Sequence, residues 1–327
     1  MQSEEHLLSL LRLQNGYISG KTLAKEIGIS TSAISKRIRN LRKYGYNIES
    51  RHRIGYRLAG ETDLPLPWEL IKVLHTMFLG KEKIIYRLTT HSTQNLAILL
   101  AEKNPSSDGL VIIAEQQKSG RGRRNRKWLS PKGGIWLSVV LRPRISASKM
   151  TLLSFAAALA VCDAIKKTTQ LNAKLRWPND VTISGKKVAG ILIDSSMEGE
   201  RIDYAVIGMG INANVDPSAI SSHLEKSIKV TSLSDELGHK ISILGLSKVI
   251  LERLEYYYME LKRCAPHKII DEWKKNSDIL HQNVAVIQNN RTIQGIAADV
   301  KDDGSLLVRT DDCDSINVVA SDIHVRY

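Results

Sequence analysis

The chain has 327 residues and a formal net charge of +13, from 47 basic and 34 acidic side chains. Its 43% hydrophobic and 25% charged residues are ordinary for a soluble globular protein with two or three domains. No apolar run has the length of a membrane span, and the acidic N-terminus lacks the basic start of a secretory signal. We therefore expect a soluble globular protein and no membrane span.

The cysteines and histidines give no sign of a disulfide framework or a zinc site. Cys162, Cys264 and Cys313 are far apart and contain no Cys-x-x-Cys pair, and no His-x-x-x-His pair occurs. An odd number of separated cysteines is typical of a reducing compartment. We expect a cytoplasmic protein without a structural metal.

The positive charge is concentrated near the N-terminus. Residues 1–62 hold 11 basic and 5 acidic side chains, whereas residues 283–327 hold 4 basic and 7 acidic ones. A charge that serves only solubility has no reason to cluster in this way. The clustering favours a nucleic acid or nucleotide partner.

The first 45 residues predict three short helices. The apolar spacing predicts helices over residues 7–13 and 21–27, and Gly28 suits the C-cap of the second. Ser30 suits the N-cap of a third helix, whose apolar face carries Ile34, Ile38 and Leu41. A tight turn before a helix with a basic, polar outer face is the pattern of a helix-turn-helix.

Residues 46–58 predict a two-stranded hairpin with a basic tip, as in the wing of a winged helix. Winged helices also serve in protein contacts alone, but the basic helix face and wing favour DNA. The DNA-binding residues predicted from this pattern are Ser32, Ser35, Lys36, Arg39, Arg51 and Arg53. Two prolines within residues 60–67 indicate a linker, so we assign residues 1–62 to a winged helix DNA-binding domain.

The central region predicts a sheet with helices. Strands are expected at 83–88, 109–115, 135–141, 173–177, 181–183, 187–194 and 203–209, and a helix at 152–166. Ser184-Gly185 suits a two-residue turn. Runs of strands broken by occasional helices indicate an α+β fold, here a mixed ligand-binding domain over 63–274 with helices on one face of its sheet.

Residues 120–128 read Gly-Arg-Gly-Arg-Arg-Asn-Arg-Lys-Trp and are called the Gly-Arg loop here. From Lys118 to Lys132 there are seven basic side chains and no acidic one. Glycines permit a close backbone approach to a ligand, and arginines donate to phosphate or carboxylate. No Walker A sequence or Gly-x-Gly-x-x-Gly fingerprint with its acidic residue occurs, so this loop is expected to bind any nucleotide phosphates.

Residues 275–327 predict a small β-barrel of the SH3 type. Short apolar and polar alternations occupy 284–287, 291–297, 305–309 and 317–319. Turn residues Asn289-Asn290 and Asp302-Asp303-Gly304 separate them. The helical stretch before it, around residues 244–264, is expected to be structural.

Several segments of the central region, taken together, resemble the biotin protein ligase family, and in particular its bifunctional members that also repress the biotin operon. The matching segments are Ser92-Thr93, Gln117, the Gly-Arg loop, Arg-Trp-Pro-Asn-Asp at 176–180, Lys-Val-Ala-Gly-Ile-Leu at 187–192 and Gly-Met-Gly-Ile-Asn at 208–212. Read alone, Ser92 suits a helix N-cap, residues 176–180 suit a turn and Lys187 suits a solvent-facing position. The Gly-Arg loop and the Trp-Pro-Asn-Asp segment are the specific parts of the match.

The resemblance implies a two-step reaction. Biotin and ATP form biotinyl-5′-AMP, with Mg²⁺ bridging the phosphates, and a lysine of a biotin carboxyl carrier protein then receives the biotin. It also implies a homodimer that binds operator DNA when it carries the adenylate, with no membrane partner. We assign no residues of the protein as a metal-binding site of its own.

The resemblance also implies residue roles. The catalytic residues are Lys187, Arg121 and Asp180. The biotin-binding residues are Ser92, Thr93, Gln94, Gln117, Gly120, Arg121, Arg123, Trp128, Lys187 and Gly190. The ATP-binding residues are Arg123, Arg124, Arg126, Lys127, Asn179 and Asn212. Asn179 and Asp180 are expected either to position metal or to accept a proton from the acceptor lysine.

Two positions depart from the family pattern. Asn125 stands where glycine is usual, and because asparagine tolerates a left-handed backbone the loop is expected to form. Gln94 stands where asparagine often follows the Ser-Thr pair.

Three other functions remain open from the sequence. A ligand-sensing transcription factor without ligase activity is disfavoured by Lys187, Arg121 and Asp180. A lipoate or octanoate transfer enzyme is expected to carry a different loop. A ligase whose winged helix has no operator is compatible with every motif.

Overall fold

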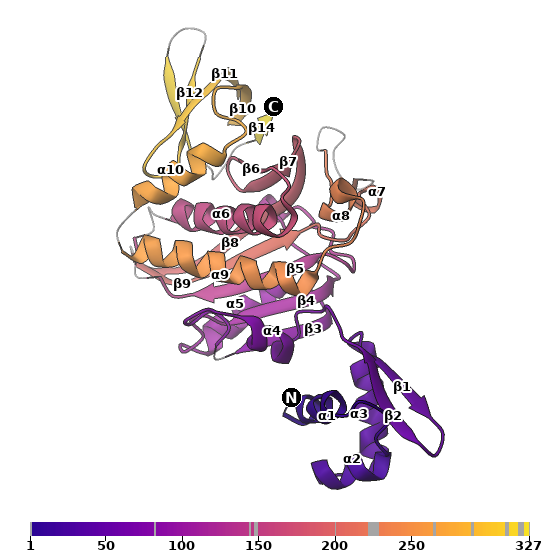
Figure 1. The fold of residues 1–327 in the computed structure, drawn as a ribbon. Coiled ribbons are helices and arrows are strands. Elements are labelled where there is room, and N and C mark those ends of the chain that lie inside the picture. Colours follow the sequence, from indigo (N-terminus) through magenta and orange to yellow (C-terminus); the bar gives the residue numbers. More distant parts are fainter. Residues whose placement is uncertain are drawn as a thin grey trace. The chain divides into compact units, whose positions relative to one another are not determined.

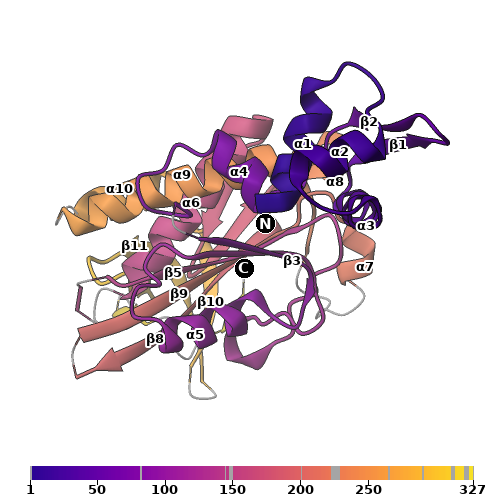
Figure 2. The ribbon, with the colours of Figure 1, turned by 90° about the horizontal axis from the view of Figure 1, so that it is seen from below.

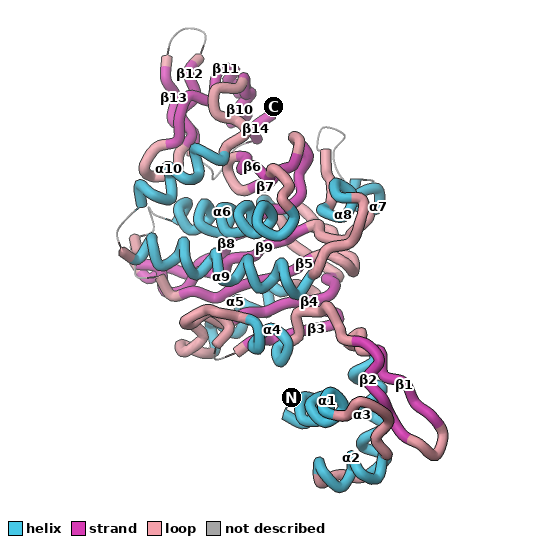
Figure 3. The backbone as a smooth tube through the Cα atoms, viewed as in Figure 1, coloured by secondary structure: helices cyan, strands magenta, loops and turns pink. Residues whose placement is uncertain are grey.

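The computed structural model describes residues 2–81, 83–143, 145–146, 150–199, 201–221, 229–263, 266–288, 291–310, 314–319 and 324–326. Cys264, Cys313 and the predicted turn residues Asn289-Asn290 lie outside these ranges. The chain folds into two compact units, residues 1–69 and 70–327. Their helices and strands are labelled in Figure 1 and coloured by type in Figure 3.

The first unit is a helix-turn-helix with a wing, as predicted. It contains α1 (Gln2–Leu13), α2 (Gly20–Ile27), α3 (Thr31–Lys43) and an antiparallel hairpin of β1 (Asn47–Arg51) and β2 (Gly55–Gly60). Ser30 caps α3 by accepting from the amide of Ala33 at 3.2 Å, and Gly28 ends α2 with a φ of 74°. The core is formed by apolar residues of the three helices, including Leu7, Leu11, Leu23, Ile34, Ile38 and Leu41.

The second unit is built on a seven-stranded mixed sheet with the order β3-β4-β5-β9-β8-β7-β6. Its strands are β3 (Ile84–Thr90), β4 (Val111–Gln117), β5 (Ile135–Leu141), β6 (Ala173–Arg176), β7 (Asp180–Ile183), β8 (Lys186–Glu198) and β9 (Arg201–Ile211). The pair β3 and β4 is parallel and the other pairs are antiparallel. The predicted turn at Ser184-Gly185 is confirmed, with φ values of 49° and 76°.

Helices cover both faces of this sheet, so the expectation of one covered face was wrong. Figure 2 shows α5 (Thr93–Lys103) on one side of the strands and α6 (Met150–Thr169) with α9 (Ile243–Lys262) on the other. Ala97 and Ala101 of α5 pack on Ile112, Val140 and Val206. The central strands bury consecutive apolar residues, and such strands need cover on both faces.

Strands β8 and β9 extend beyond the predicted ranges to Glu198 and from Arg201. The extension contains exposed polar residues, such as Ser195 and Glu198. Backbone pairing continues there without burial, so the apolar pattern understated the strand lengths.

The remaining elements complete the second unit. They are α4 (Pro67–Val73), which crosses the boundary between the units, α7 (Pro217–Ser221), α8 (Leu233–Leu237), α10 (Pro266–Asn276) and a five-stranded antiparallel sheet. This sheet has the order β13-β12-β11-β10-β14 and consists of β10 (Asn283–Gln288), β11 (Arg291–Val300), β12 (Leu306–Arg309), β13 (Ser315–Val318) and β14 (His324–Arg326). In the part of the chain that the structure describes, no helix is long and apolar enough to cross a membrane.

Candidate functional site

A cavity of about 770 Å³ opens in the second unit at one end of the seven-stranded sheet. Its lining comes from the start of α5, the Gly-Arg loop, β7, β8 and the segment that follows β9. All the predicted ligand-binding and catalytic residues of the central region line it except Gly120. Among the described lining residues, eight are lysine or arginine and Asp180 is the one acid, so the cavity suits an anionic ligand.

A hydrogen-bonded group of neutral side chains forms one side of the cavity. It consists of Thr93, Gln94, Gln117 and Ser138, which line the cavity, and of Ser130, which bonds to Gln117 without lining it; the group is called the polar wall. Gln117 Oε1 accepts from the amide of Thr93 at 2.7 Å, and Gln117 Nε2 donates to Ser130 Oγ at 2.8 Å. Ser138 Oγ donates to Gln94 Oε1 at 3.0 Å. The neighbouring Ser92 is the N-cap of α5, as its sequence context indicated, and it also lines the cavity.

Gln94 already donates both of its amide hydrogens within the protein. Its Nε2 lies 3.0 Å from Asp194 Oδ2 and 2.9 Å from the carbonyl oxygen of Val206. Gln94 can therefore hydrogen-bond to a ligand only through its side-chain carbonyl oxygen, as an acceptor.

Glycines set the position of Trp128. A Cβ atom on Gly120 would lie 2.3 Å from the carbonyl oxygen of Trp128, and one on Gly210 would lie 2.6 Å from its indole nitrogen. A Cβ on Gly190 would lie 3.0 Å from the same ring. These three positions thus allow the Trp128 ring to lie on the strands, and they explain a glycine at position 120, which does not line the cavity.

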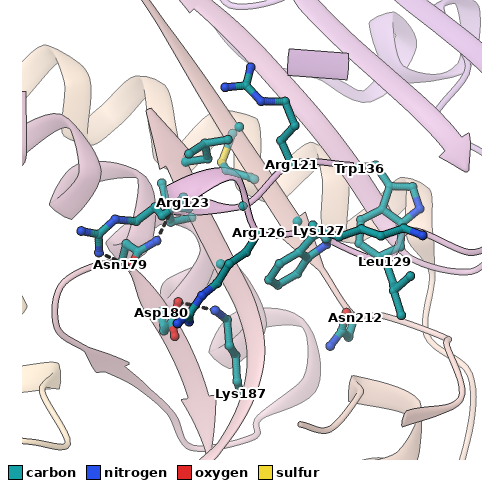
Figure 4. Close-up of a pocket in the computed structure, with 18 of the residues that line it drawn as sticks. Arg121, Arg123, Arg126, Lys127, Leu129, Trp136, Asn179, Asp180, Lys187 and Asn212 are labelled. Carbon is teal, nitrogen blue, oxygen red and sulfur yellow. Dashed lines mark hydrogen bonds and ion pairs between the residues drawn. The ribbon is translucent and has the colours of Figure 1, made fainter. Parts of the chain in front are cut away.

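Lys187 and Asp180 form an ion pair inside the cavity, with Lys187 Nζ 2.7 Å from Asp180 Oδ1 (Figure 4). The Lys187 ammonium also lies 5.1 Å from the centre of the Trp128 ring. The adjacent Lys186 pairs instead with Glu236 at 2.8 Å, and this hydrogen bond raises the pKa of the Lys186 amine. Lys187 is therefore the lysine of β8 that is available to an anion in the cavity.

The Gly-Arg loop is held over the Trp-Pro-Asn-Asp turn. Arg123 donates to Asn179 Oδ1 at 3.1 Å, and Arg126 extends toward Asp180 in Figure 4. Arg124 adopts a left-handed φ of 55° in the short 3₁₀ turn η1 (Arg123–Asn125). The side chain of Asn125, whose effect on the loop was the open question, is outside the described part of the chain.

Asn212 lines the cavity from the segment that follows β9. It is 2% exposed, and its Nδ2 donates to the carbonyl oxygen of Thr231 at 3.0 Å. Within the described chain, neither Asn212 Oδ1 nor the indole nitrogen of Trp128 has a hydrogen-bond partner. Trp136 and Ile220 add apolar lining nearby, so this part of the cavity suits a flat apolar group that also forms hydrogen bonds.

Four polar residues of the site had no place among the predicted ones. Asp194 contacts Gln94 and Arg121, Asn95 Oδ1 accepts from Arg121 at 2.8 Å, and Ser130 and Ser138 belong to the polar wall. Ser138 and Asp194 each interrupt an apolar strand sequence, and that interruption was the available signal. Asn95 gave no separate signal because it follows the cap of a helix.

The Trp-Pro-Asn-Asp turn is also tied to the C-terminal part of the unit. Arg176 forms a 2.6 Å ion pair with Asp278, and the Trp177 indole donates to the carbonyl oxygen of Gly304 at 3.0 Å. The turn that presents Asn179 and Asp180 is thereby supported from the C-terminal part of the unit.

In the first unit, five of the six predicted DNA contacts are exposed, and Ser35 is half-buried. Arg51 lies over the Tyr17 ring at 4.8 Å from its centre, beside the Arg57–Glu49 ion pair of 2.9 Å. The Tyr17 hydroxyl donates to Glu49 at 2.5 Å, and this hydrogen bond, with the one from Arg57, lowers the pKa of Glu49. The base of the wing is thus fixed, while Arg53 at its tip is exposed.

Comparison with known families defines the class of protein. Residues 3–57 match the HTH domain, residues 85–212 match the Biotin/lipoate A/B protein ligase family, and residues 279–323 match the Biotin protein ligase C terminal domain. The fold and the cavity therefore define a protein ligase that carries an N-terminal helix-turn-helix.

Individual relatives narrow this class. The chain is 35% identical to Bifunctional ligase/repressor BirA of Bacillus subtilis over 301 residues, which are 91% of each chain. It is 28% identical to the protein of that name from Escherichia coli over 306 residues, 91% of this chain and 90% of the relative. A biotin protein ligase from Aquifex aeolicus, solved in complex with biotin and ATP, matches with a TM-score of 0.64 and 26% identity over 75% of this chain and 99% of that one. The chain belongs to the biotin protein ligase family.

Proposed function

We propose that this protein joins biotin to a carboxyl carrier protein at the expense of ATP and represses the biotin operon through its helix-turn-helix. The observation that carries the proposal is that one cavity brings together the Gly-Arg loop, the Lys187–Asp180 pair, the polar wall and Asn212. Its relatives of similar length are named as bifunctional ligase/repressors, and the Aquifex ligase was solved with biotin and ATP. We assign the reaction to the cytoplasm.

In the first step, a carboxylate oxygen of biotin attacks the α-phosphorus of ATP. The bond from that phosphorus to the bridging oxygen of the β-phosphate breaks, and pyrophosphate leaves with the electron pair. Because both reactants are anions, the protein must first overcome their repulsion. Lys187 donates to the carboxylate and an α-phosphate oxygen, while Arg123, Arg124, Arg126 and Lys127 attract the triphosphate.

In the second step, the amine of the acceptor lysine attacks the carbonyl carbon of biotinyl-5′-AMP. The carbon–oxygen bond to the phosphate breaks, AMP leaves, and the attacking nitrogen loses a proton as the amide forms. Asp180 is suited to accept that proton, since it lines the cavity beside Lys187.

Mg²⁺, when bound to the triphosphate, neutralises part of its charge and that of the leaving pyrophosphate. Asp180 is also the described lining carboxylate that would hold it, since Mg²⁺ prefers carboxylate oxygens. Asn179 does not suit a ligand role, because its amide is already bonded to Arg123 and to the carbonyl oxygen of Ile191.

The two ends of the cavity suit the two substrates. We assign the neutral ureido ring of biotin to the polar wall, with Ser92, Thr93 and Gln117 as hydrogen-bonding side chains and Gln94 as an acceptor. Trp128 and Gly190 border the apolar chain of biotin. At the far end we assign adenine to Asn212, whose free Oδ1 can accept from the adenine amino group.

The test of the ligase activity is biotin-dependent exchange of labelled pyrophosphate into ATP by the full chain, with lipoate and octanoate as parallel substrates. The proposal expects exchange with biotin alone. Exchange with lipoate or octanoate instead would assign the protein to that other transfer chemistry. No exchange with any acid would favour a ligand sensor without ligase activity.

For the second activity, we propose that a homodimer carrying biotinyl-5′-AMP binds paired half-sites in operator DNA. The exposed Ser32, Lys36, Arg39, Arg51 and Arg53 support a DNA-binding surface. Fluorescence anisotropy with a duplex from upstream of the biotin biosynthesis genes should show binding that tightens when biotin and ATP are added. If an unrelated duplex binds equally well, with and without biotin and ATP, the protein would be a ligase whose helix-turn-helix has no specific operator.

A further inference from the structure

Two cations assigned to the reaction each face a different carboxylate. Lys187 Nζ lies 2.7 Å from Asp180 Oδ1, and a guanidinium nitrogen of Arg121 lies 3.5 Å from Asp194 Oδ1. The first pair lies inside the cavity, whereas Asp194 is on β8 and is not among the lining residues. Figure 4 shows Arg121 pointing away from the Lys187–Asp180 pair. The position of Arg121 is thus governed by a separate set of contacts.

Asp194 is fixed from the buried side by Gln94. Gln94 Nε2 donates to Asp194 Oδ2 at 3.0 Å and to the carbonyl oxygen of Val206 at 2.9 Å. Asp194 and Val206 face each other across β8 and β9, and Gln94 is only 4% exposed. Because the Gln94 side-chain amide is also bonded to the strand backbone and to Ser138, it fixes the orientation of the carboxylate that pairs with Arg121.

A second contact orients the same arginine. Asn95 Oδ1 accepts from the other terminal nitrogen of Arg121 at 2.8 Å. The guanidinium therefore lies between α5 and β8, next to the polar wall. An arginine held by two fixed partners loses less side-chain entropy when it binds a ligand.

We propose that Asp194 is a positioning residue that keeps Arg121 at the biotin end of the cavity, with Gln94 as its support. This rests on the proposed function, in which biotin occupies the polar wall, beside which the Arg121 guanidinium lies. Without Asp194, the guanidinium is free to move toward the triphosphate, where Arg123 and Arg126 already lie. Arg121 then serves the nucleotide rather than biotin.

The bond between Gln94 and Asp194 can be tested by exchanging the lengths of the two side chains. Replacing Gln94 by Asn shortens its reach by one methylene, and replacing Asp194 by Glu lengthens the opposite side chain by one. Each single change breaks or strains the 3.0 Å bond, whereas the two together keep the span between α5 and β8. Rescue by the pair is a result that a general loss of stability does not produce.

The experiment is pyrophosphate exchange by the full chain with biotin and ATP varied in turn. Asp194→Asn should lower kcat/KM for biotin by about tenfold and leave the KM for ATP unchanged, because a misplaced arginine affects one substrate. The combination Gln94→Asn with Asp194→Glu restores the bond between these two side chains and should be more active toward biotin than either single variant. The control is Asp203→Asn, which breaks the 2.8 Å Arg142–Asp203 pair of the same sheet, away from the cavity, and should have wild-type kinetics.

Three results would overturn the assignment of Asp194 in an active wild-type protein. They are unchanged kinetics in Asp194→Asn, an equal loss toward biotin and ATP, and no rescue by the paired exchange. A wild-type protein without any exchange would instead refute the proposed function, and the role of Arg121 with it. Thermal melting of each variant identifies losses that come from unfolding.

Discussion

Lys187 and its neighbour Lys186 differ in their partners although they are adjacent in the sequence. Lys187 reaches Asp180 in the cavity, and Lys186 reaches Glu236 outside it. In an alternating strand, adjacent side chains point to opposite faces. The pair therefore offers a matched test of which lysine serves the reaction.

Lys187→Ala should reduce pyrophosphate exchange by about a hundredfold or more, since removal of one charge-stabilising donor costs about that much. Lys186→Ala removes the same charge one residue away and should retain exchange close to that of the wild type. Initial rates at saturating biotin and ATP measure both variants. Equal rates for the two would refute the role of Lys187.

Gly120 is needed for the shape of the loop rather than for a contact with ligand. Gly120→Ala should weaken biotin binding strongly, because the new Cβ would lie 2.3 Å from the Trp128 carbonyl oxygen and 2.6 Å from Ser130 Oγ. Isothermal titration with biotin measures the effect. Ser119→Ala, at the exposed neighbouring position, is the control and should bind as the wild type does. Unchanged binding by Gly120→Ala would mean that the loop can accept the displacement.

At the scale of elements, one glutamate of α9 holds the segment that follows α4. Glu255 is 7% exposed, and its carboxylate accepts from the amides of Met77, Phe78 and Leu79 at 2.5, 2.9 and 3.0 Å. These amides belong to no helix or strand, so the carboxylate supplies the acceptors that regular structure would otherwise provide.

Glu255→Gln should destabilise the second unit by about 2 kcal/mol, since hydrogen bonds to a charged group are lost and an amide donor faces backbone donors. Glu252→Gln is the comparison on the same helix: Glu252 accepts from one backbone amide, that of His75 at 3.0 Å, and forms surface ion pairs with Lys248 and the His75 ring, so this change should cost less. Urea denaturation followed by circular dichroism gives both values. Similar losses in the two variants would argue against a special role of Glu255.

The Gly-Arg loop depends on elements that are distant in the sequence. Arg121 contacts α5 and β8, Arg123 contacts the turn before β7, and Trp128 lies over Gly190 and Gly210. The composition of the loop predicted an anion site, but it could not predict which side chain points to which end. The strands and turns beneath the loop determine the direction of each of its side chains.

At the scale of the whole molecule, the two proposed activities use residues of different units. The double variant Lys36→Ala with Arg39→Ala should weaken operator binding by about tenfold or more and lower the salt dependence by about two charges. Biotin transfer to the carrier protein should be unchanged. Lys240→Ala with Lys275→Ala removes two exposed charges from the second unit and is the charge-matched control. Equal loss of DNA binding in both variants would indicate general electrostatic attraction rather than a surface on α3.

The local elements of the molecule could be predicted because their signals are local. Ser30 and Gly28 marked the ends of helices, Ser184-Gly185 marked a hairpin turn, and apolar runs marked the buried strands. The order of the strands and the cover on both faces could not be predicted, because they depend on which buried surfaces meet. The same limit hid Asp194 and Asn95, whose importance comes from side chains up to about a hundred residues away.

The helix-turn-helix, the strand-rich domains and the family could be identified from the chain alone, because capping residues, apolar periodicity and the Gly-Arg and Trp-Pro-Asn-Asp segments each lie within short stretches. The contacts of Lys187 with Asp180, of Gln94 with Asp194 and of Arg121 with Asp194 became visible in the folded protein. Those contacts act over a few ångströms between residues far apart in the chain. The packing of α5 and the strands brings them together, and no local pattern records it.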